Sequence, residues 1–202
     1  MYLSQQKQTI MKKGPVKGRI RCSIVSYLLT QKSRLMLLTT TKDGYLVYDR
    51  YNSHLHKEAI PFLGKALERI TTKDKNFLIE EVTFDCTIGF SKCVETTEED
   101  EIIFAQRINR NGLTRFVRNR QPKPCSTMVV ILKRVENGSA YLLITAYVGR
   151  RGLVEPWDWS SHARTSDPIT SYHSSVRYWK SHALLWEEEC VIQGTETVHP
   201  WH

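Results

Sequence analysis

The sequence lacks several features that would place it in a familiar class of protein. No apolar run approaches the ~18 residues of a membrane-spanning helix, and the polar, basic start MYLSQQKQTIMKKGPVKGR has no apolar core like that of a secretory signal. Hydrophobic residues make up 41% of the 202 residues and charged residues 25%, which excludes collagenous, coiled-coil and disordered chains. We therefore expect a globular cytoplasmic protein with no membrane partner.

Cysteine pairs and cofactor motifs are also missing. The five cysteines are widely spaced and form no CxxC pair, so the sequence predicts neither a disulfide framework nor a zinc ribbon. It contains no GxGxxG, Walker, HEXXH or GxSxG motif. His54 and His56 form an HxH pair, but no third metal ligand lies near them in the sequence. We expect no metal and no cofactor.

Acidic residues are absent from two long basic stretches. The net charge is +8, and residues 1–21 carry six basic residues while residues 102–135 carry eight. An acidic run, residues 95–101, lies between them. Arginine dominates the second stretch, and its planar guanidinium binds phosphate well. The pattern predicts a phosphate-binding surface and RNA as the partner, and two solvated strand faces beside an acidic loop are the alternative.

The hydrophobic pattern predicts an α+β fold. Residues 18–50 alternate like strands and contain the hairpin signal Asp43-Gly44, while residues 56–72 have helical spacing. Residues 102–148 read as a four-stranded antiparallel meander, and residues 172–186 as a C-terminal docking helix that carries His182 on its apolar face. We expect a basic flexible tail over 1–17 and one domain over 18–202. Its N-terminal hairpin and helix part spans 18–75, and its antiparallel-sheet part spans 76–202.

The stretch from about Val82 to Trp186 resembles a widespread, poorly characterised bacterial protein family. The matching residues are Gly89, Cys93-Val94, Thr96, Asp100-Glu101-Ile102, Arg107, Thr114-Arg115-Phe116-Val117, Arg120, Pro122, Pro124, Thr145-Ala146, Glu155-Pro156-Trp157-Asp158 and the segment WKSHAL that begins at Trp179. More remotely, the order of helix, four-stranded sheet and terminal TAY strand is similar to the barnase–EndoU–colicin–RelE superfamily of metal-independent ribonucleases. This resemblance implies an endoribonuclease related to bacterial or phage toxins, which an inhibitory protein partner would hold in check.

RNA cleavage of this kind needs a base for the 2′-OH, an acid for the leaving oxygen and cations for the phosphorane. Arg107 and Arg115 flank a predicted Asn-Gly turn, where two like charges repel unless an anion lies between them. We predict the catalytic residues to be Arg115, Thr145, His182 and Arg107, with Glu155 as a substitute base. We predict the nucleic-acid-binding residues to be Arg110, Arg118, Arg120, Lys123, Arg150, Arg151 and Trp157. A non-catalytic RNA-binding or protein-interaction module, in which the tryptophans and His182 merely pack, is the open alternative.

Overall fold

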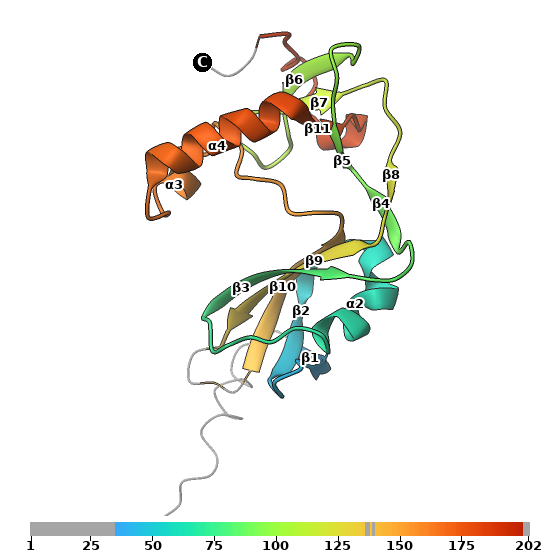
Figure 1. Ribbon diagram of the computed structural model, residues 1–202, viewed down its shortest axis with the longest axis vertical. Helices are drawn as coiled ribbons and strands as arrows, with labels where there is room; N and C mark the ends of the chain where they lie inside the picture. The colour runs from blue at the N-terminus through green and yellow to red at the C-terminus, as the bar shows by residue number, and fades with distance from the viewer. Residues whose placement is uncertain (1–34, 136–137, 139, 200–202) are drawn as a thin grey trace, which may run out of the picture. The chain divides into compact units, whose positions relative to one another are not determined.

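The computed structural model describes residues 35–135, 138 and 140–199, with the backbone alone for residues 50–54. Over this part of the chain the protein is α+β, with helices and three β-sheets (Figure 1). The predicted fold class is therefore confirmed. The predicted tail over 1–17 lies outside the described residues. None of the described helices is long and apolar enough to cross a membrane.

The largest sheet has five strands. Their order is β1 (Leu35–Thr40), β2 (Leu46–Leu55), β10 (Ala140–Val148), β9 (Thr127–Arg134) and β3 (Phe77–Thr83). β2 and β10 are parallel, and the other neighbours are antiparallel. The pairing brings β2 next to β10, which is distant from it in sequence.

The turn between β1 and β2 is the one that the Asp43-Gly44 signal predicted. Gly44 has a φ of 86°, a conformation that a residue with a Cβ rarely adopts. The Asp43 carboxylate accepts hydrogen bonds from the Thr41 hydroxyl (2.7 Å) and from the Thr72 amide and hydroxyl (both 2.8 Å). Burial on its own raises the pKa of Asp43, but these hydrogen bonds outweigh it and the pKa is lowered. The hairpin is thereby tied to the chain that follows α2.

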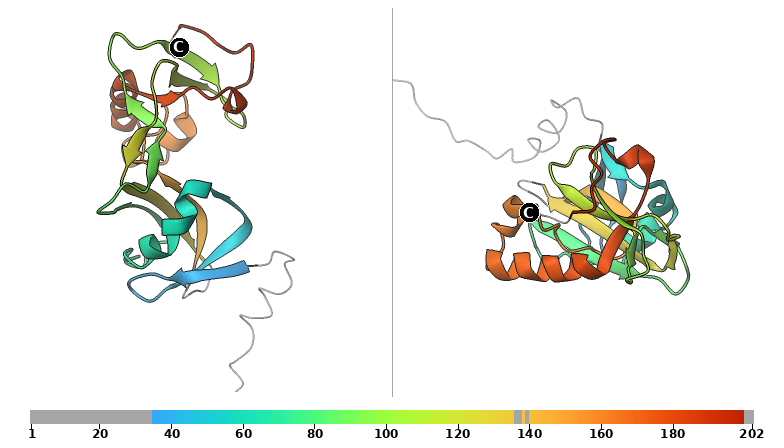
Figure 2. Two further views of the ribbon diagram at one scale, coloured as in Figure 1. Left: turned by 90° about the vertical axis from the view of Figure 1, so that its right-hand side faces the viewer. Right: turned by 90° about the horizontal axis from the view of Figure 1, so that it is seen from above.

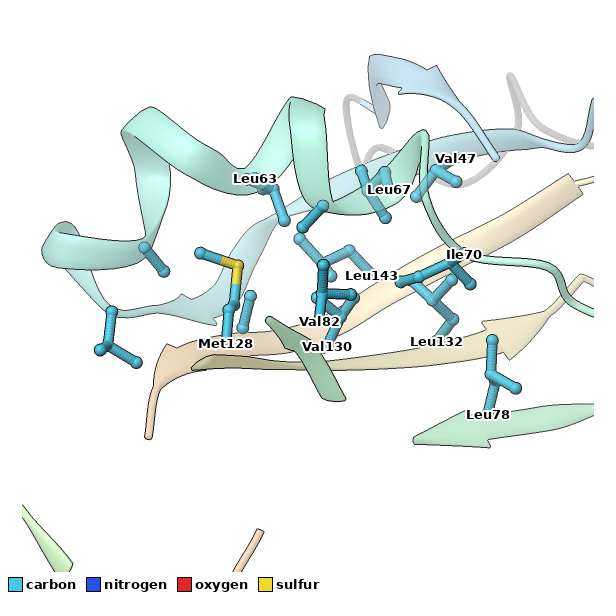
Figure 3. Close-up of a cluster of buried hydrophobic side chains, with 14 of the residues drawn as sticks. Val47, Leu63, Leu67, Ile70, Leu78, Val82, Met128, Val130, Leu132 and Leu143 are labelled. Carbon is cyan, nitrogen blue, oxygen red and sulfur yellow. The ribbon is translucent and has the colours of Figure 1, made fainter. Parts of the chain in front are cut away.

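One face of the five-stranded sheet is covered by α2 (Ile60–Leu67), which follows a 3-10 turn at Lys57–Ala59. The helix lies within the predicted span of 56–72 and is shorter at both ends. Its buried side chains pack on alternate residues of the strands (Figure 3). The core includes Leu63, Leu67, Ile70, Leu78, Val82, Met128, Val130, Leu132, Leu143, Ala146 and Val148. Because successive side chains of a strand alternate between faces, the residues between these positions face away from α2.

A second sheet has four strands. Their order is β5 (Cys93–Glu95), β11 (His182–Leu185), β7 (Leu113–Val117) and β6 (Ile102–Gln106). One apolar cluster contains Val94, Val117, Ala183 and Leu185, and another contains Ala105, Phe116 and Val191. Strand alternation places these two clusters on opposite faces of the sheet. This sheet therefore has packing of its own, separate from the core under α2.

The predicted four-stranded meander over residues 102–148 is not found. β6 pairs with β7, and β9 pairs with β10, but the two pairs belong to different sheets. Between them β8 (Lys123–Cys125) pairs with β4 (Gly89–Ser91) in a two-stranded sheet. Turn signals specify which strands form a hairpin, but not which hairpins share a sheet. The connection that leads from one sheet to the other contains Pro122 and Pro124, which cannot donate amide hydrogen bonds.

The predicted helix over 172–186 is displaced. α4 (Pro168–Ser181) begins earlier, at a cap where Asp167 accepts a hydrogen bond from the Thr170 amide (3.1 Å). Its end is followed at once by β11, which Figure 2 shows from two further directions. The segment HALL fits a helical spacing, but as a central strand it has β5 on one side and β7 on the other. Pairing on both sides satisfies its backbone groups and overrides the local preference.

The segment from β10 to α4 carries a short helix, α3 (Trp159–His162), and packs against the β6–β7 turn. Trp157 lies so close to Gly112 that a Cβ on Gly112 would overlap the indole. The Trp157 indole nitrogen is buried and has no hydrogen-bond partner among the described residues. Gly112 is therefore required by this close approach rather than only by the turn.

Replacing Gly112 should disturb this packing. We expect Gly112→Ala to lower the free energy of unfolding by about 1–3 kcal/mol, as overpacking typically does. Gly64 in α2 is the matched control, since a Cβ there meets nothing within 4 Å, and Gly64→Ala should stabilise the helix by about 0.5–1 kcal/mol. Thermal unfolding of the two variants measures both changes. Equal melting temperatures for Gly112→Ala and wild type would show that Trp157 does not pack there.

Candidate functional site

The arginines at the end of the β6–β7 hairpin have acidic partners. The Arg120 guanidinium donates from Nε and Nη2 to the two carboxylate oxygens of Asp100, at 2.5 and 3.1 Å. Arg118 Nη1 lies 3.6 Å from Glu101 Oε1, and its guanidinium lies over the Trp186 ring at 4.5 Å. The acidic run over 95–101 therefore folds back onto this basic stretch and supplies carboxylate partners that the stretch itself does not contain.

Arg107 belongs to a partly buried ion pair. Its Nη2 donates to Glu155 Oε2 at 2.5 Å, and its Nε donates to the Thr114 hydroxyl oxygen at 3.1 Å. The Thr114 hydroxyl donates to Glu155 Oε1, also at 2.5 Å. The Glu155 side chain is only 10% exposed and that of Arg107 is 27% exposed. These contacts engage both carboxylate oxygens of Glu155, so Arg107, Thr114 and Glu155 form one hydrogen-bonded set.

Arg115 points to the opposite face of the β6–β7 hairpin. Its Nη1 donates to the Thr96 hydroxyl at 2.8 Å and to the backbone carbonyl of His182 at 2.9 Å. Burial lowers the pKa of this guanidinium, with a nearby Asp100 acting in the other direction. Arg115 therefore joins β7 to the start of β11 and to the end of β5.

Thr145 lies in the other sheet. In β10 it is in register with Ile131 of β9 and with His54 of β2. The four residues predicted to be catalytic thus occupy three environments: Arg107 is paired with Glu155, Arg115 with the backbone at His182, and Thr145 lies on the five-stranded sheet. Thr145 shares its sheet face with Tyr147, two residues further on, and that face holds a different set of reactive side chains.

We name the set around this tyrosine the Tyr147 cluster. Its members are His56, Glu81, Cys93, Tyr147, Arg151 and Tyr178. Tyr147 lies between the core residues Ala146 and Val148, so its side chain faces away from α2. Tyr147 is in register with Val129, and Val129 with Glu81. Tyr147 and Glu81 therefore lie in one row, two strand spacings or roughly 10 Å apart at their Cα atoms.

Tyr178 reaches the cluster from α4. Its hydroxyl lies 3.6 Å from Cys93 Sγ, and its ring stacks on His182 with centroids 3.9 Å apart and planes 12° apart. His182 Nδ1 lies 3.1 Å from the backbone carbonyl oxygen of Tyr178. The stack and this contact hold His182 against α4. His182 thus packs against the face of the Tyr178 ring.

Both tyrosines of the cluster hold their protons more tightly than usual. Burial is the main cause that raises the pKa of Tyr147, and Glu81 and Cys93 add to it while Arg151 opposes it. Burial also raises the pKa of Tyr178, together with Cys93, Tyr147 and Glu81. Burial raises the pKa of the Cys93 thiol as well. At neutral pH these phenols can donate a proton or a hydrogen bond, and the thiol is not an activated nucleophile.

Arg151 and His56 complete the cluster. The backbone amide of Arg151 donates to Glu81 Oε1 at 2.6 Å, which places the start of the segment after β10 beside β3. Among the described residues, no carboxylate forms an ion pair with Arg150 or Arg151, and both are exposed. The His56 ring lies 5.8 Å from the Tyr147 ring, and the His56 amide donates to the Ala146 carbonyl at 3.3 Å. The His56 and Tyr147 rings are thus neighbours at one end of β10, and Glu81, in the same row as Tyr147, holds the backbone of Arg151.

The remaining residues predicted to bind nucleic acid are Arg110, Lys123 and Trp157. Arg110 is exposed in the β6–β7 turn, and Lys123 is exposed in β8. Trp157 is packed on Gly112. A cavity of about 570 Å³ lies elsewhere, on the second sheet. It is lined by Arg118, Trp186, Glu188, Val191, Gln193 and Glu196, and its two carboxylates make it a poor place for a phosphate.

Sequence reasoning missed half of the Tyr147 cluster: Glu81, Cys93 and Tyr178. Tyr147 was visible as part of the TAY strand, but a tyrosine in a strand is ordinary. Glu81 and Cys93 belong to no recognised catalytic motif. Tyr178 lies in the predicted C-terminal helix, where His182 on the apolar face was the residue considered. Strand register places Glu81 in the same row as Tyr147, and the packing of α4 brings Tyr178 to Cys93. The His54 side chain lies outside the described residues, and the described residues contain no group of three metal-ligating side chains.

The Arg107–Glu155 pair predicts a structural role that can be measured. We expect Arg107→Ala to lower the free energy of unfolding by about 3 kcal/mol, because it leaves a nearly buried carboxylate with Thr114 alone. Arg118→Ala is the matched control: its partner Glu101 is 60% exposed, so the loss should stay under about 1 kcal/mol. Urea unfolding of both variants gives the two values. A similar loss for both would contradict the structural role of Arg107.

Asp100 should make stability depend on acid pH. Hydrogen bonds from Arg120, then from the Thr97 amide, lower the pKa of Asp100 in the folded protein. The folded state then binds fewer protons than the unfolded state, so the stabilisation is present above the ordinary aspartate pKa of ~3.9 and is lost as the pH falls below it. Asp100→Asn should flatten the fall in melting temperature below about pH 4. The control variant Asp85→Asn changes an exposed aspartate and should keep the wild-type fall in melting temperature. An identical pH profile for Asp100→Asn and wild type would contradict the role of Asp100.

Comparisons with known proteins do not place the chain in a family. No protein-family model matches it, and no curated protein matches it. Among solved structures, it is similar to the 2.35 Å crystal structure of a conserved hypothetical protein from Toxoplasma gondii ME49. The two chains are 15% identical with a TM-score of 0.46, over 66% of this chain and 87% of that one.

Proposed function

We propose that the protein is a metal-independent endoribonuclease that cleaves RNA at the Tyr147 cluster. The proposal keeps the reaction class and the ribonuclease superfamily that the sequence resemblance implies, and it moves the reaction away from the β6–β7 arginines. The observation that supports this most is geometric: the His56 ring lies 5.8 Å from the Tyr147 ring, and the Arg151 backbone amide is bound by Glu81, which lies in the same row of the sheet as Tyr147. His56, Tyr147 and Arg151 are the three kinds of group that the reaction needs: a proton acceptor, a proton donor and a cation.

Each group has a defined part in the reaction. The His56 imidazole takes the 2′-OH proton, since imidazole is the side chain best suited to accept a proton near neutral pH. The 2′-oxygen attacks the adjacent phosphorus, and the bond from phosphorus to the 5′-oxygen breaks. Tyr147 gives its phenolic proton to that leaving oxygen. The products are a 2′,3′-cyclic phosphate and a free 5′-hydroxyl, and no outside reactant is needed.

Arg151 stabilises the negative charge of the phosphorane. Arg107 and Arg120 donate to carboxylates and Arg115 to a backbone carbonyl, whereas Arg151 has no such partner among the described residues. Glu81 accepts the Arg151 backbone amide, so it positions the residue without neutralising the side chain through an ion pair. RNA is accordingly the proposed partner, and an inhibitory protein that covers this face would block the reaction.

The reaction is tested with single substitutions at the cluster. We expect Tyr147→Phe and His56→Ala each to lower the cleavage rate of single-stranded RNA by about 10²–10⁴-fold, as loss of a general acid or base does. Arg151→Ala should lower it by about 10²–10³-fold, by analogy with a lost oxyanion donor. Melting temperatures should stay at the wild-type value, because Tyr147→Phe keeps the ring and the other two residues are exposed.

Matched controls lie away from the cluster. Tyr45→Phe, His199→Ala and Arg110→Ala change the same residue types at other described positions and should cleave like wild type. The assay is run with EDTA and the product ends are identified, with a cyclic phosphate expected. Cleavage that EDTA abolishes, or cluster variants as active as the controls, would overturn the proposal. If wild type binds RNA in a salt-dependent way but never cleaves it, the protein is a non-catalytic RNA-binding module.

A further inference from the structure

A chain of aromatic rings runs from the interior to the surface at α3 and the first turns of α4. His162 is fully buried, and its ring lies 6.2 Å from that of Trp159 and 5.9 Å from that of Tyr172. The Trp159 and Tyr172 rings are 6.2 Å apart, and Tyr172 is 5.5 Å from His173. Trp159 is nevertheless 53% exposed. Trp159 belongs neither to the core under α2 nor to the apolar clusters of the second sheet.

These rings are held in place before any ligand arrives. His162 Nε2 donates to the Glu155 carbonyl oxygen at 3.2 Å, so Nδ1 is the acceptor for the Ser171 hydroxyl at 2.9 Å. Asp158 caps α3 by accepting from the Ser161 amide at 3.1 Å. A large exposed ring on a pre-ordered support loses little conformational freedom when a flat ligand stacks on it.

The outer side of α4 is basic. The 14 residues of α4 contain no aspartate or glutamate. His173, Arg177 and Lys180 are all exposed, and their spacing of four and three residues places them along one side of the helix. No ion pair to Arg177 or Lys180 occurs among the described residues. We call Trp159, Tyr172, His173, Arg177 and Lys180 the α4 ridge.

We propose that the α4 ridge binds single-stranded RNA, with bases stacked on Trp159 and Tyr172 and phosphates bound by Arg177 and Lys180. This rests on the proposed function, whose substrate it specifies as unpaired RNA. Aromatic rings next to cations are the general solution for binding single strands, because every base has a face that can stack. A duplex keeps its bases stacked on one another and offers none to Trp159. The next residue after Arg177 is Tyr178 of the Tyr147 cluster, so a strand on the ridge lies close to the proposed reaction.

The test uses a 2′-O-methylated single-stranded RNA oligonucleotide, which lacks the attacking hydroxyl and cannot be cleaved. We expect Trp159→Ala to weaken its binding roughly tenfold and Trp159→Phe to recover most of that loss, since a phenyl ring still stacks. Arg177→Ala should weaken binding and reduce the slope of log affinity against log salt by about 0.7. The fully paired duplex of the same oligonucleotide should bind more weakly than the single strand and be insensitive to Trp159→Ala.

Two controls lie outside the ridge, one of them on α4 itself. Ile169→Ala changes a 64% exposed residue in the first turn of α4, and Lys65→Ala removes an exposed charge from α2; neither should change binding. Arg177→Ala provides a second variant if Trp159→Ala melts early. Equal affinity of both ridge variants and wild type, or an equal effect of Trp159→Ala on the duplex, would overturn the inference. If the ridge variants bind like wild type but Tyr147→Phe still abolishes cleavage, the catalytic proposal stands without the ridge. If the ridge binds as expected but wild type never cleaves, the ridge stands and the catalytic proposal falls.

Discussion

Glu155 is the residue through which much of the described structure is joined. Its carboxylate holds Arg107 and Thr114 of the β6–β7 hairpin, and its backbone carbonyl accepts the hydrogen bond from buried His162. The segment after β10 is thereby tied to the second sheet on one side and to α3 on the other. Trp157, two residues on, fills the space above Gly112. The course of this segment positions Arg151 beside Glu81 and orders the rings at α3.

Ion pairs neutralise several arginines of the basic stretch over 102–135. Along the chain, acidic and basic residues are sorted into separate stretches, as in proteins with a single-sign binding surface. In the fold the acidic run over 95–101 meets Arg118 and Arg120, and Glu155 meets Arg107. Arg107, Arg118 and Arg120 of this basic stretch are therefore engaged in ion pairs around the second sheet. Arg150, Arg151, Arg177 and Lys180 form no ion pair among the described residues and lie after β10 and on α4, where the two proposals place a phosphate.

The two proposed surfaces share α4, and the helix supplies each with a different side. Tyr178 points inward to Cys93 and the Tyr147 cluster, while Arg177 is exposed beside it. Because consecutive helix residues point in directions roughly 100° apart, one helix can support a reaction on one side and hold a strand of RNA on another.

Local sequence determined the α+β class, the Asp43-Gly44 hairpin, α2 and the pairing of β6 with β7, because turn chemistry and the period of apolar residues act over a few neighbouring positions. Tertiary structure alone decided that β9 and β10 join β2 and β3 rather than β7, and that His182 begins a strand. A segment such as HALL suits a helix or a strand, and only the presence of β5 and β7 on its two sides makes the strand more stable. The Tyr147 cluster was likewise beyond local reasoning. Glu81 and Tyr147 come together through strand register, and Tyr178 joins them through the packing of α4, so no spacing along the chain records that they meet.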